Sequence, residues 1–227
     1  CELNTLEGRE EDVGAFGVQS FPTSHDVPCV GYRIHTPDGK TMTIATDLGV
    51  LTPPVHEALA GCDLVALESN YDLHMLRSGP YPYYLRSRIE SARGHLSNDE
   101  CSAKLLELIQ EGCKRFALCH LSQENNTPAL ALQTVFNTLG AEYITSAKPG
   151  GYIIMDELGF MEKDAEKFKR AVFNALDGDI PVIAAVKARY DVDFLNRIRA
   201  HEKAQLYTIT PENRDALYAE LLGIITR

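Results

Sequence analysis

The chain has 227 residues, of which 44% are hydrophobic and 24% charged, a balance that excludes a disordered or collagen-like protein. No apolar run approaches the roughly 18 residues of a membrane helix, so we expect a cytoplasmic protein with no membrane partner. The formal net charge of −10 argues against a broad, sequence-independent grip on phosphate backbones. A bound dication could still supply the positive charge that a phosphate-directed site needs.

The six cysteines show no Cys-x-x-Cys pair and no short regular spacing. This pattern indicates neither a zinc ribbon nor a redox motif, and a disulfide framework is not expected in a chain of this length without an export signal. We expect most of the cysteines to be small buried residues in a reducing compartment.

The first two thirds of the chain predict a hairpin followed by alternating helices and strands. Short β-branched runs flank Pro37-Asp38-Gly39-Lys40, which is typical of a hairpin turn. Proline at first helical positions, Ser or Asn N-caps and a closing glycine mark the helices. The expected elements are strands at 31–34 and 41–46, a helix at 53–60 with Pro53 and Pro54 in its first turn, a strand at 64–67, an irregular and partly helical stretch at 71–93, a helix at 101–110, a strand at 116–119, and a helix at 128–139 closed by Gly140.

The last third has a more regular rhythm, which begins after Gly150-Gly151. Strands that alternate with helices predict right-handed crossovers and a parallel sheet. The expected strands lie at 152–155, 181–186 and 205–209, and the expected helices at 164–176, 194–201 and 212–224. The stretch Lys148 to Gly151 is the best boundary candidate, so we predict two domains, 1–148 and 149–227.

Three residues at predicted strand ends form the first candidate site. His25 follows Phe21 to Ser24, while Asp47 and His120 each end a strand. Imidazole nitrogens and a carboxylate at converging strand ends make a ligand set for zinc, manganese or iron. Taken singly, a histidine or aspartate at a strand end more often caps a turn or meets solvent.

The segments around these residues resemble the C-terminal half of the metallo-β-lactamase fold, specifically the YycJ/WalJ-type hydrolases, over about residues 13–140. The resemblance implies an αββα sandwich and metal-assisted hydrolysis of phosphodiesters or DNA. It also implies that His25, Asp47 and His120 bind metal. The segments that carry it are Ser24-His25-Asp26, Gly31-Tyr32, Thr46 to Gly49, Glu68 to Asp72, Gly94 to Asn98 and His120 to Asn126.

Two further polar residues fall on family positions near that site. Glu68 and His95 are candidates for a proton relay or a phosphate contact, although Glu68 could instead satisfy a turn and His95 could cap a helix. The family's principal motif, His-x-His-x-Asp-His, is absent from this sequence. The three matching ligands could therefore hold only a partial metal site.

An acidic pair after an apolar run forms the second candidate site. Ile153 to Met155 precede Asp156 and Glu157, an arrangement in which the aspartate can hold Mg²⁺ and the glutamate can activate water, as in a Walker-B motif. A strand that simply enters an acidic turn would look the same.

The residues from about 150 to the end resemble the C-terminal half of the small P-loop nucleoside-triphosphatases related to the human cancer-related NTPase. That resemblance implies Mg²⁺ with nucleotide at Asp156 and catalysis by Glu157, and it includes Asn213 and Arg214. No Walker-A loop is present, since Gly39-Lys40-Thr41 lies in the predicted hairpin and Ile34 stands where the first glycine is required.

The leading interpretation is an α/β chain with a partial metallo-β-lactamase sandwich followed by a partial P-loop NTPase-like parallel unit. Both lack their first halves and the chain begins at Cys1, so we expect a truncated or fused reading frame in which neither site need be active. A nucleoside-triphosphatase and a non-catalytic interaction module are the alternatives. The expected partners are a nucleic acid or phosphodiester substrate, a nucleotide, and a second copy of the chain through an exposed apolar face.

Overall fold

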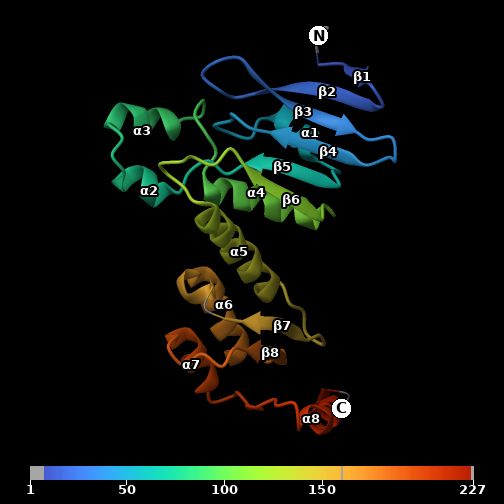
Figure 1. The fold of residues 1–227 in the computed structure, drawn as a ribbon, viewed down its shortest axis with the longest axis vertical. Coiled ribbons are helices and arrows are strands. Elements are labelled where there is room, and N and C mark those ends of the chain that lie inside the picture. Colours follow the sequence, from blue (N-terminus) through green and yellow to red (C-terminus); the bar gives the residue numbers. More distant parts are fainter. Residues whose placement is uncertain (1–7, 160, 226–227) are drawn as a thin grey trace.

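The computed structural model describes residues 8–159 and 161–225. Cys1, which the sequence analysis names, lies outside these residues. A six-stranded sheet with the order β1-β2-β3-β4-β5-β6 forms the N-terminal part (Figure 1). Its strands are β1 (Glu10–Val13), β2 (Phe16–Thr23), β3 (Cys29–His35), β4 (Thr41–Ala45), β5 (Leu64–Glu68) and β6 (Arg115–Cys119).

The pairing of these strands gives four of them a common direction. β2, β3 and β4 are successively antiparallel, whereas β4, β5 and β6 are parallel. β2, β4, β5 and β6 therefore all end at one edge of the sheet, which we call the carboxyl edge. The β3–β4 hairpin confirms the predicted turn, since Gly39 has a φ of 77° that suits glycine. β1 was not predicted, and of β2 only the end before His25 was.

Two helices cover one face of this sheet. α1 (Pro53–Leu59) and α4 (Asn98–Gln110) contribute Val55, Leu59 and Leu105 to a core that includes Val65 and Leu67 of β5. The N-terminus of α4 is fixed by a capping box between Ser97 and Glu100, as its sequence indicates. The opposite face carries Val30 and Tyr32 with 47% and 38% of their surface exposed, so it presents apolar groups to solvent.

The irregular stretch between β5 and α4 contains two short helices, α2 (Leu73–Ser78) and α3 (Tyr83–Ile89), as expected for a partly helical excursion. They lie beyond the carboxyl edge of the sheet (Figure 1). Asp72 caps α2 by accepting a hydrogen bond from Met75 N–H. This excursion supplies a wall for the site described below.

The C-terminal part contains a two-stranded parallel sheet and three α-helices in the described residues. β7 (Ile153–Leu158) pairs with β8 (Val182–Val186) through the register Ile153↔Val182. The helical elements are a 3₁₀ turn η1 (Met161–Asp164), α6 (Glu166–Asp177), α7 (Asp193–Arg199) and α8 (Arg214–Ile225). The strand predicted at 205–209 is wrong, because these residues form no ladder in the described chain.

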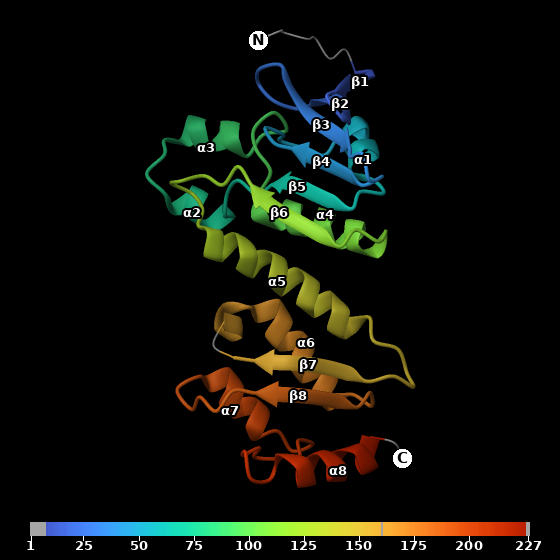
Figure 2. The same cartoon turned by 45° about the vertical axis from the view of Figure 1, so that its right-hand side comes forward.

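A long helix, α5 (Pro128–Thr145), lies between the two sheets in both views (Figures 1 and 2). The prediction that Gly140 ends this helix is wrong, since α5 continues for five more residues. A Cβ atom at Gly140 would lie 2.7 Å from Phe168 Cδ2, so the glycine instead permits close packing of α5 against α6. The predicted boundary at 148–149 falls in the loop after α5.

Among the described residues, no helix combines the length and the apolar character that crossing a bilayer requires. Five cysteines in this part of the chain are free thiols, in agreement with the sequence analysis. Burial raises the pKa of Cys101 to about 12 and that of Cys119 to about 11, which keeps both thiols protonated and unreactive near neutrality.

Candidate functional site

Five polar residues meet at the carboxyl edge of the six-stranded sheet. His25 follows β2, Asp47 follows β4, Glu68 ends β5 and His120 follows β6, while His95 comes from the loop before α4. Because β2, β4, β5 and β6 share a direction, segments that are far apart in sequence converge here. The structure thus brings together all five residues that the sequence analysis placed in the first site.

The ligand atoms of these residues lie at metal-site separations. His25 Nε2 is 3.8 Å and His120 Nε2 is 3.6 Å from Asp47 Oδ1. Two groups of ligand atoms lie within 4.8 Å of one another, namely His25, Asp47 and His95, and Glu68, His95 and His120. His95 is therefore closer to the predicted ligands than the sequence indicated, and its ring lies 4.9 Å from that of His25 and 5.2 Å from that of His120.

Buried hydrogen bonds fix the orientation of the histidine rings. His25 Nδ1 lies 2.9 Å from the carbonyl oxygen of Gly94, and His120 Nδ1 lies 2.8 Å from Glu68 Oε1. Carbonyl and carboxylate oxygens only accept, so in a neutral ring Nδ1 carries the proton and Nε2 keeps its lone pair. This is the tautomer that a metal ligand needs, and such support is a regular feature of metal-binding histidines.

Glu68 is the centre of this network. Its side chain is fully buried, its Oε1 lies 2.6 Å from His95 Nδ1, and its Oε2 accepts a hydrogen bond from Leu48 N–H at 2.9 Å. Burial raises the pKa of Glu68, but the hydrogen bonds from His120, His95 and Leu48 N–H outweigh burial and hold the pKa below its usual value. The hydrogen bond to Glu68 in turn raises the pKa of His120.

Backbone strain is concentrated at two of the predicted ligands. Asp47 and His120 have φ values of 53° and 56°, and they are the non-glycine residues with positive φ in the described chain. Such conformations are costly and cluster at functional sites. Gly94 allows the backbone next to this site to pack closely against the end of α3, since a Cβ atom there would lie 2.1 Å from the carbonyl oxygen of Ile89.

A buried network of amide side chains holds the surrounding loops. Asn98 and Asn126 exchange two side-chain hydrogen bonds of 3.0 and 2.8 Å. Asn126 also donates to the carbonyl oxygen of Ser69 at 2.8 Å, and Asn70 donates to that of His120 at 2.8 Å. The loops after β5 and β6 and the start of α4 are therefore tied together beneath the site.

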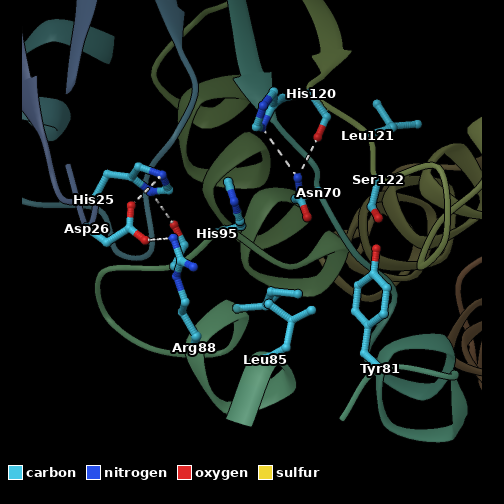
Figure 3. Close-up of a pocket in the computed structure, with 12 residues that line it drawn as sticks. His25, Asp26, Asn70, Tyr81, Leu85, Arg88, His95, His120, Leu121 and Ser122 are labelled. Atoms are coloured by element: carbon cyan, nitrogen blue, oxygen red, sulfur yellow. Dashed lines mark hydrogen bonds and ion pairs between the residues drawn. The ribbon is translucent and has the colours of Figure 1, made fainter. Parts of the chain in front are cut away.

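An open pocket of about 360 Å³ adjoins the histidines (Figure 3). Arg88 on α3 forms an ion pair with Asp26, whose Oδ1 lies 3.1 Å from His25 Nε2. The Arg88 hydrogen bond holds the pKa of Asp26 below its usual value. Asp26, Arg88 and the facing Tyr81 were not identified by the sequence analysis, because only the fold brings α3 to this edge.

The second predicted site is built differently from the first. Asp156 and Glu157 lie within β7 rather than after it, and both are exposed. Glu157 Oε1 forms an ion pair with Lys187 Nζ at 2.7 Å. Asn213, which the sequence left without a role, exchanges hydrogen bonds with Thr210 and donates to the carbonyl oxygen of Thr208, so it holds the turn that precedes α8.

Comparisons with known proteins match both parts of the chain. A family model described as NTPase matches residues 106–222. Exodeoxyribonuclease WalJ of Streptococcus pneumoniae is 33% identical over 132 residues, covering 58% of this chain and 49% of that protein. Exodeoxyribonuclease YycJ of Bacillus anthracis is also 33% identical over 132 residues, covering 56% of this chain and 50% of that protein. These matches confirm the first resemblance.

Nucleoside-triphosphatase THEP1 of Methanocaldococcus jannaschii is 36% identical over 90 residues, covering 39% of this chain and 49% of that protein. This match confirms the second resemblance. Among solved structures, the metallo-β-lactamase fold protein YhfI of Bacillus subtilis aligns with a TM-score of 0.46 and 18% identity, covering 60% of this chain and 48% of that one. The chain spans about half the length of the curated relatives that it matches.

Proposed function

The chain belongs to the NTPase family through residues 106–222, and we propose that the site at the carboxyl edge of its six-stranded sheet is that of a metal-dependent phosphodiesterase. The convergence of His25, Asp47, Glu68, His95 and His120 carries this proposal. The similarity to bacterial exodeoxyribonucleases supports a nucleic acid as the substrate.

The residues fit a divalent cation by their chemistry and tautomers. His25 and His120 would hold it through Nε2, and Asp47 through its carboxylate, a set that suits zinc, manganese or iron. When bound, such an ion polarises a phosphoryl oxygen and lowers the pKa of a nearby water. Glu68 orients His120 from behind, and Asp47 presents the only carboxylate among these three ligands.

His95 is proposed to move a proton during the reaction. Glu68 holds its Nδ1 at 2.6 Å, which leaves Nε2 to exchange a proton with the leaving oxygen of the substrate. A His95→Ala variant separates this role from metal ligation. Loss of turnover with native metal content fits a proton carrier, whereas loss of the metal assigns His95 to the ligand set.

The experiment that tests the function combines metal content with turnover. Purified chain is loaded with zinc, manganese or iron, and hydrolysis of bis-p-nitrophenyl phosphate is followed. We expect bound metal and turnover in the native chain, and the loss of both in His120→Ala. His56→Ala, an exposed histidine on α1, serves as the matched control. A chain that neither binds metal nor hydrolyses the ester refutes the proposal.

A second candidate function is magnesium-dependent nucleoside-triphosphate hydrolysis, which the family match favours. Asp156 would hold Mg²⁺, and Glu157 would activate water after release from Lys187. ATP or GTP hydrolysis that is abolished in Glu157→Gln would support this function. Equal hydrolysis by the native chain and the variant would exclude Glu157 from catalysis.

A further inference from the structure

The excursion of residues 71–93 differs in charge and composition from the rest of the chain. It contains four arginines and two acidic residues, a net charge of +2 in a chain whose net charge is −10. It also holds four of the ten tyrosines. Arginine and tyrosine together are typical of surfaces that bind single-stranded nucleic acid, where bases stack on rings and cations follow the backbone.

The arginines of this excursion are not all neutralised by carboxylates. Arg88 pairs with Asp26, and Arg77 pairs with Glu90 at 3.1 Å. Arg86 donates instead to the carbonyl oxygen of Arg77, and Arg93 donates to the carbonyl oxygens of His25 and Asp26 at 3.1 Å. Carbonyl oxygens carry no full charge, so positive potential remains beside the pocket.

Helical spacing puts one tyrosine of α3 on the same side as Arg88 and a second one on the side away from the pocket. Leu85 and Arg88 line the pocket from α3 (Figure 3). Tyr84 precedes Arg88 by four residues, so the two side chains lie about 40° apart around the helix. Tyr83 lies about 200° from Leu85 and projects from the back of α3. Both tyrosines are highly exposed, at 74% for Tyr84 and 77% for Tyr83.

The pocket leads from α3 to the histidines of the candidate site. Tyr81 forms the wall that faces Arg88, and its ring points toward Ser122 (Figure 3). A volume of about 360 Å³ lies at the small end of ligand pockets and suits one nucleotide rather than a duplex. An exposed ring such as Tyr84 can stack on an unpaired base or at a strand end, but not on a base inside a duplex.

We infer that Tyr84 and Arg88 form a platform on which the last unpaired nucleotides of a single nucleic-acid strand lie before the strand enters the pocket. The inference rests on the proposed phosphodiesterase function, because the platform leads to the site of His25, His95 and His120. Arg88 lines the pocket that the strand enters, and Arg86 and Arg93, which donate to carbonyl oxygens, contribute positive charge. Tyr84 contributes a stacking surface. The excursion therefore selects single strands and strand ends over intact duplexes.

Oligonucleotide binding without metal tests the platform. A fluorescein-labelled single-stranded oligothymidine is titrated with protein in EDTA and low salt, and anisotropy is recorded. Tyr84→Ala is expected to weaken binding about tenfold, because one base–aromatic stack is lost. Tyr83→Ala replaces an equally exposed tyrosine on the same helix and is expected to bind as the native chain does. Tyr84→Trp is expected to retain binding.

Several results would overturn the inference. These are native binding by Tyr84→Ala, equal losses in Tyr83→Ala and Tyr84→Ala, duplex bound as tightly as single strand, or no binding by the native chain. Thermal denaturation of each variant checks that the fold is intact. EDTA makes the result independent of hydrolysis, so a chain that binds through Tyr84 yet never cleaves supports the platform and refutes the proposed function.

Discussion

Replacement of Glu68 by glutamine tests the architecture of the candidate site most directly. The carboxylate accepts from Leu48 N–H and lies within hydrogen-bonding distance of two imidazole Nδ1 atoms. Glutamine has the same shape, but it offers one acceptor and one donor group. If its oxygen stays with Leu48 N–H, its NH₂ group faces the rings of His95 and His120. Their Nδ1 atoms must then accept, which moves the proton to the Nε2 atoms proposed for metal binding and catalysis.

The expected magnitude follows from this change of tautomer. Loss of a carboxylate partner behind a metal-binding histidine typically lowers metal affinity about 10- to 100-fold. Glu68→Ala should be worse for folding, because the buried N–H of Leu48 loses its acceptor at a cost of about 1–3 kcal/mol. The glutamine variant should therefore separate metal affinity from stability, whereas the alanine variant should lose both.

The assay measures zinc affinity by competition with a chromophoric chelator, and stability by urea unfolding in EDTA. Glu57→Gln provides the matched control, since Glu57 on α1 is exposed and takes part in no ion pair within the described residues. Native zinc affinity in Glu68→Gln would refute the assignment of Glu68 as the residue that fixes the ligand tautomer.

Two further predictions concern packing and pH. Alanine is favoured over glycine in helices by about 1 kcal/mol. An added Cβ atom at Gly223 in α8 would have no atom within 4 Å, so Gly223→Ala should slightly stabilise the folded chain. Gly140→Ala should instead destabilise by up to about 2 kcal/mol because of Phe168, and equal urea midpoints for the two variants would contradict this. In EDTA, the lowered pKa of Glu68 adds to the stability of the folded chain above the ordinary value of 4.5, and this contribution is lost as the pH falls through the pKa of the folded state. The raised pKa of His120 adds to that stability below 6.5, and this contribution is lost as the pH rises through the pKa of the folded state. The urea midpoint of the native chain should therefore exceed that of Glu68→Gln by the largest amount between about pH 4.5 and 6.5. A difference that does not change with pH would refute the interaction between Glu68 and His120.

The first site was predictable because its residues are marked by local signals. Strand ends can be located from short apolar runs and turn residues, and parallel strands bring their ends to one edge. Asp47 and His120 were identified in this way together with the resemblance. The partners of His25 and Asp26 could not be found in this way, since Gly94 reaches His25 and Arg88 reaches Asp26 only after the excursion folds back over the edge.

The errors in the C-terminal part arise from packing that a sequence does not display. Residues 205–209 include Tyr207, Thr208 and Ile209, which are common in strands, but a strand forms only where a neighbour offers its hydrogen-bonding groups. Gly140 has the form of a helix end, yet the chain continues as helix because tertiary contacts override local preference. The ring of Phe168, which lies 28 residues later, occupies the space that the glycine leaves open.

Helix α5 contacts the hydrophobic cores on both sides of it, which the boundary predicted at 148–149 does not take into account. On one side, Val135 packs against the core of the six-stranded sheet, and Thr138 Oγ1 lies 3.2 Å from Ser102 Oγ. On the other side, Ile144 belongs to the C-terminal core, and Asn137 accepts a hydrogen bond from Phe168 N–H at 2.9 Å. A cut at 148 would remove Ile144 from that core. The match of the NTPase family model begins at residue 106, so it also includes α5 and starts well before the predicted boundary.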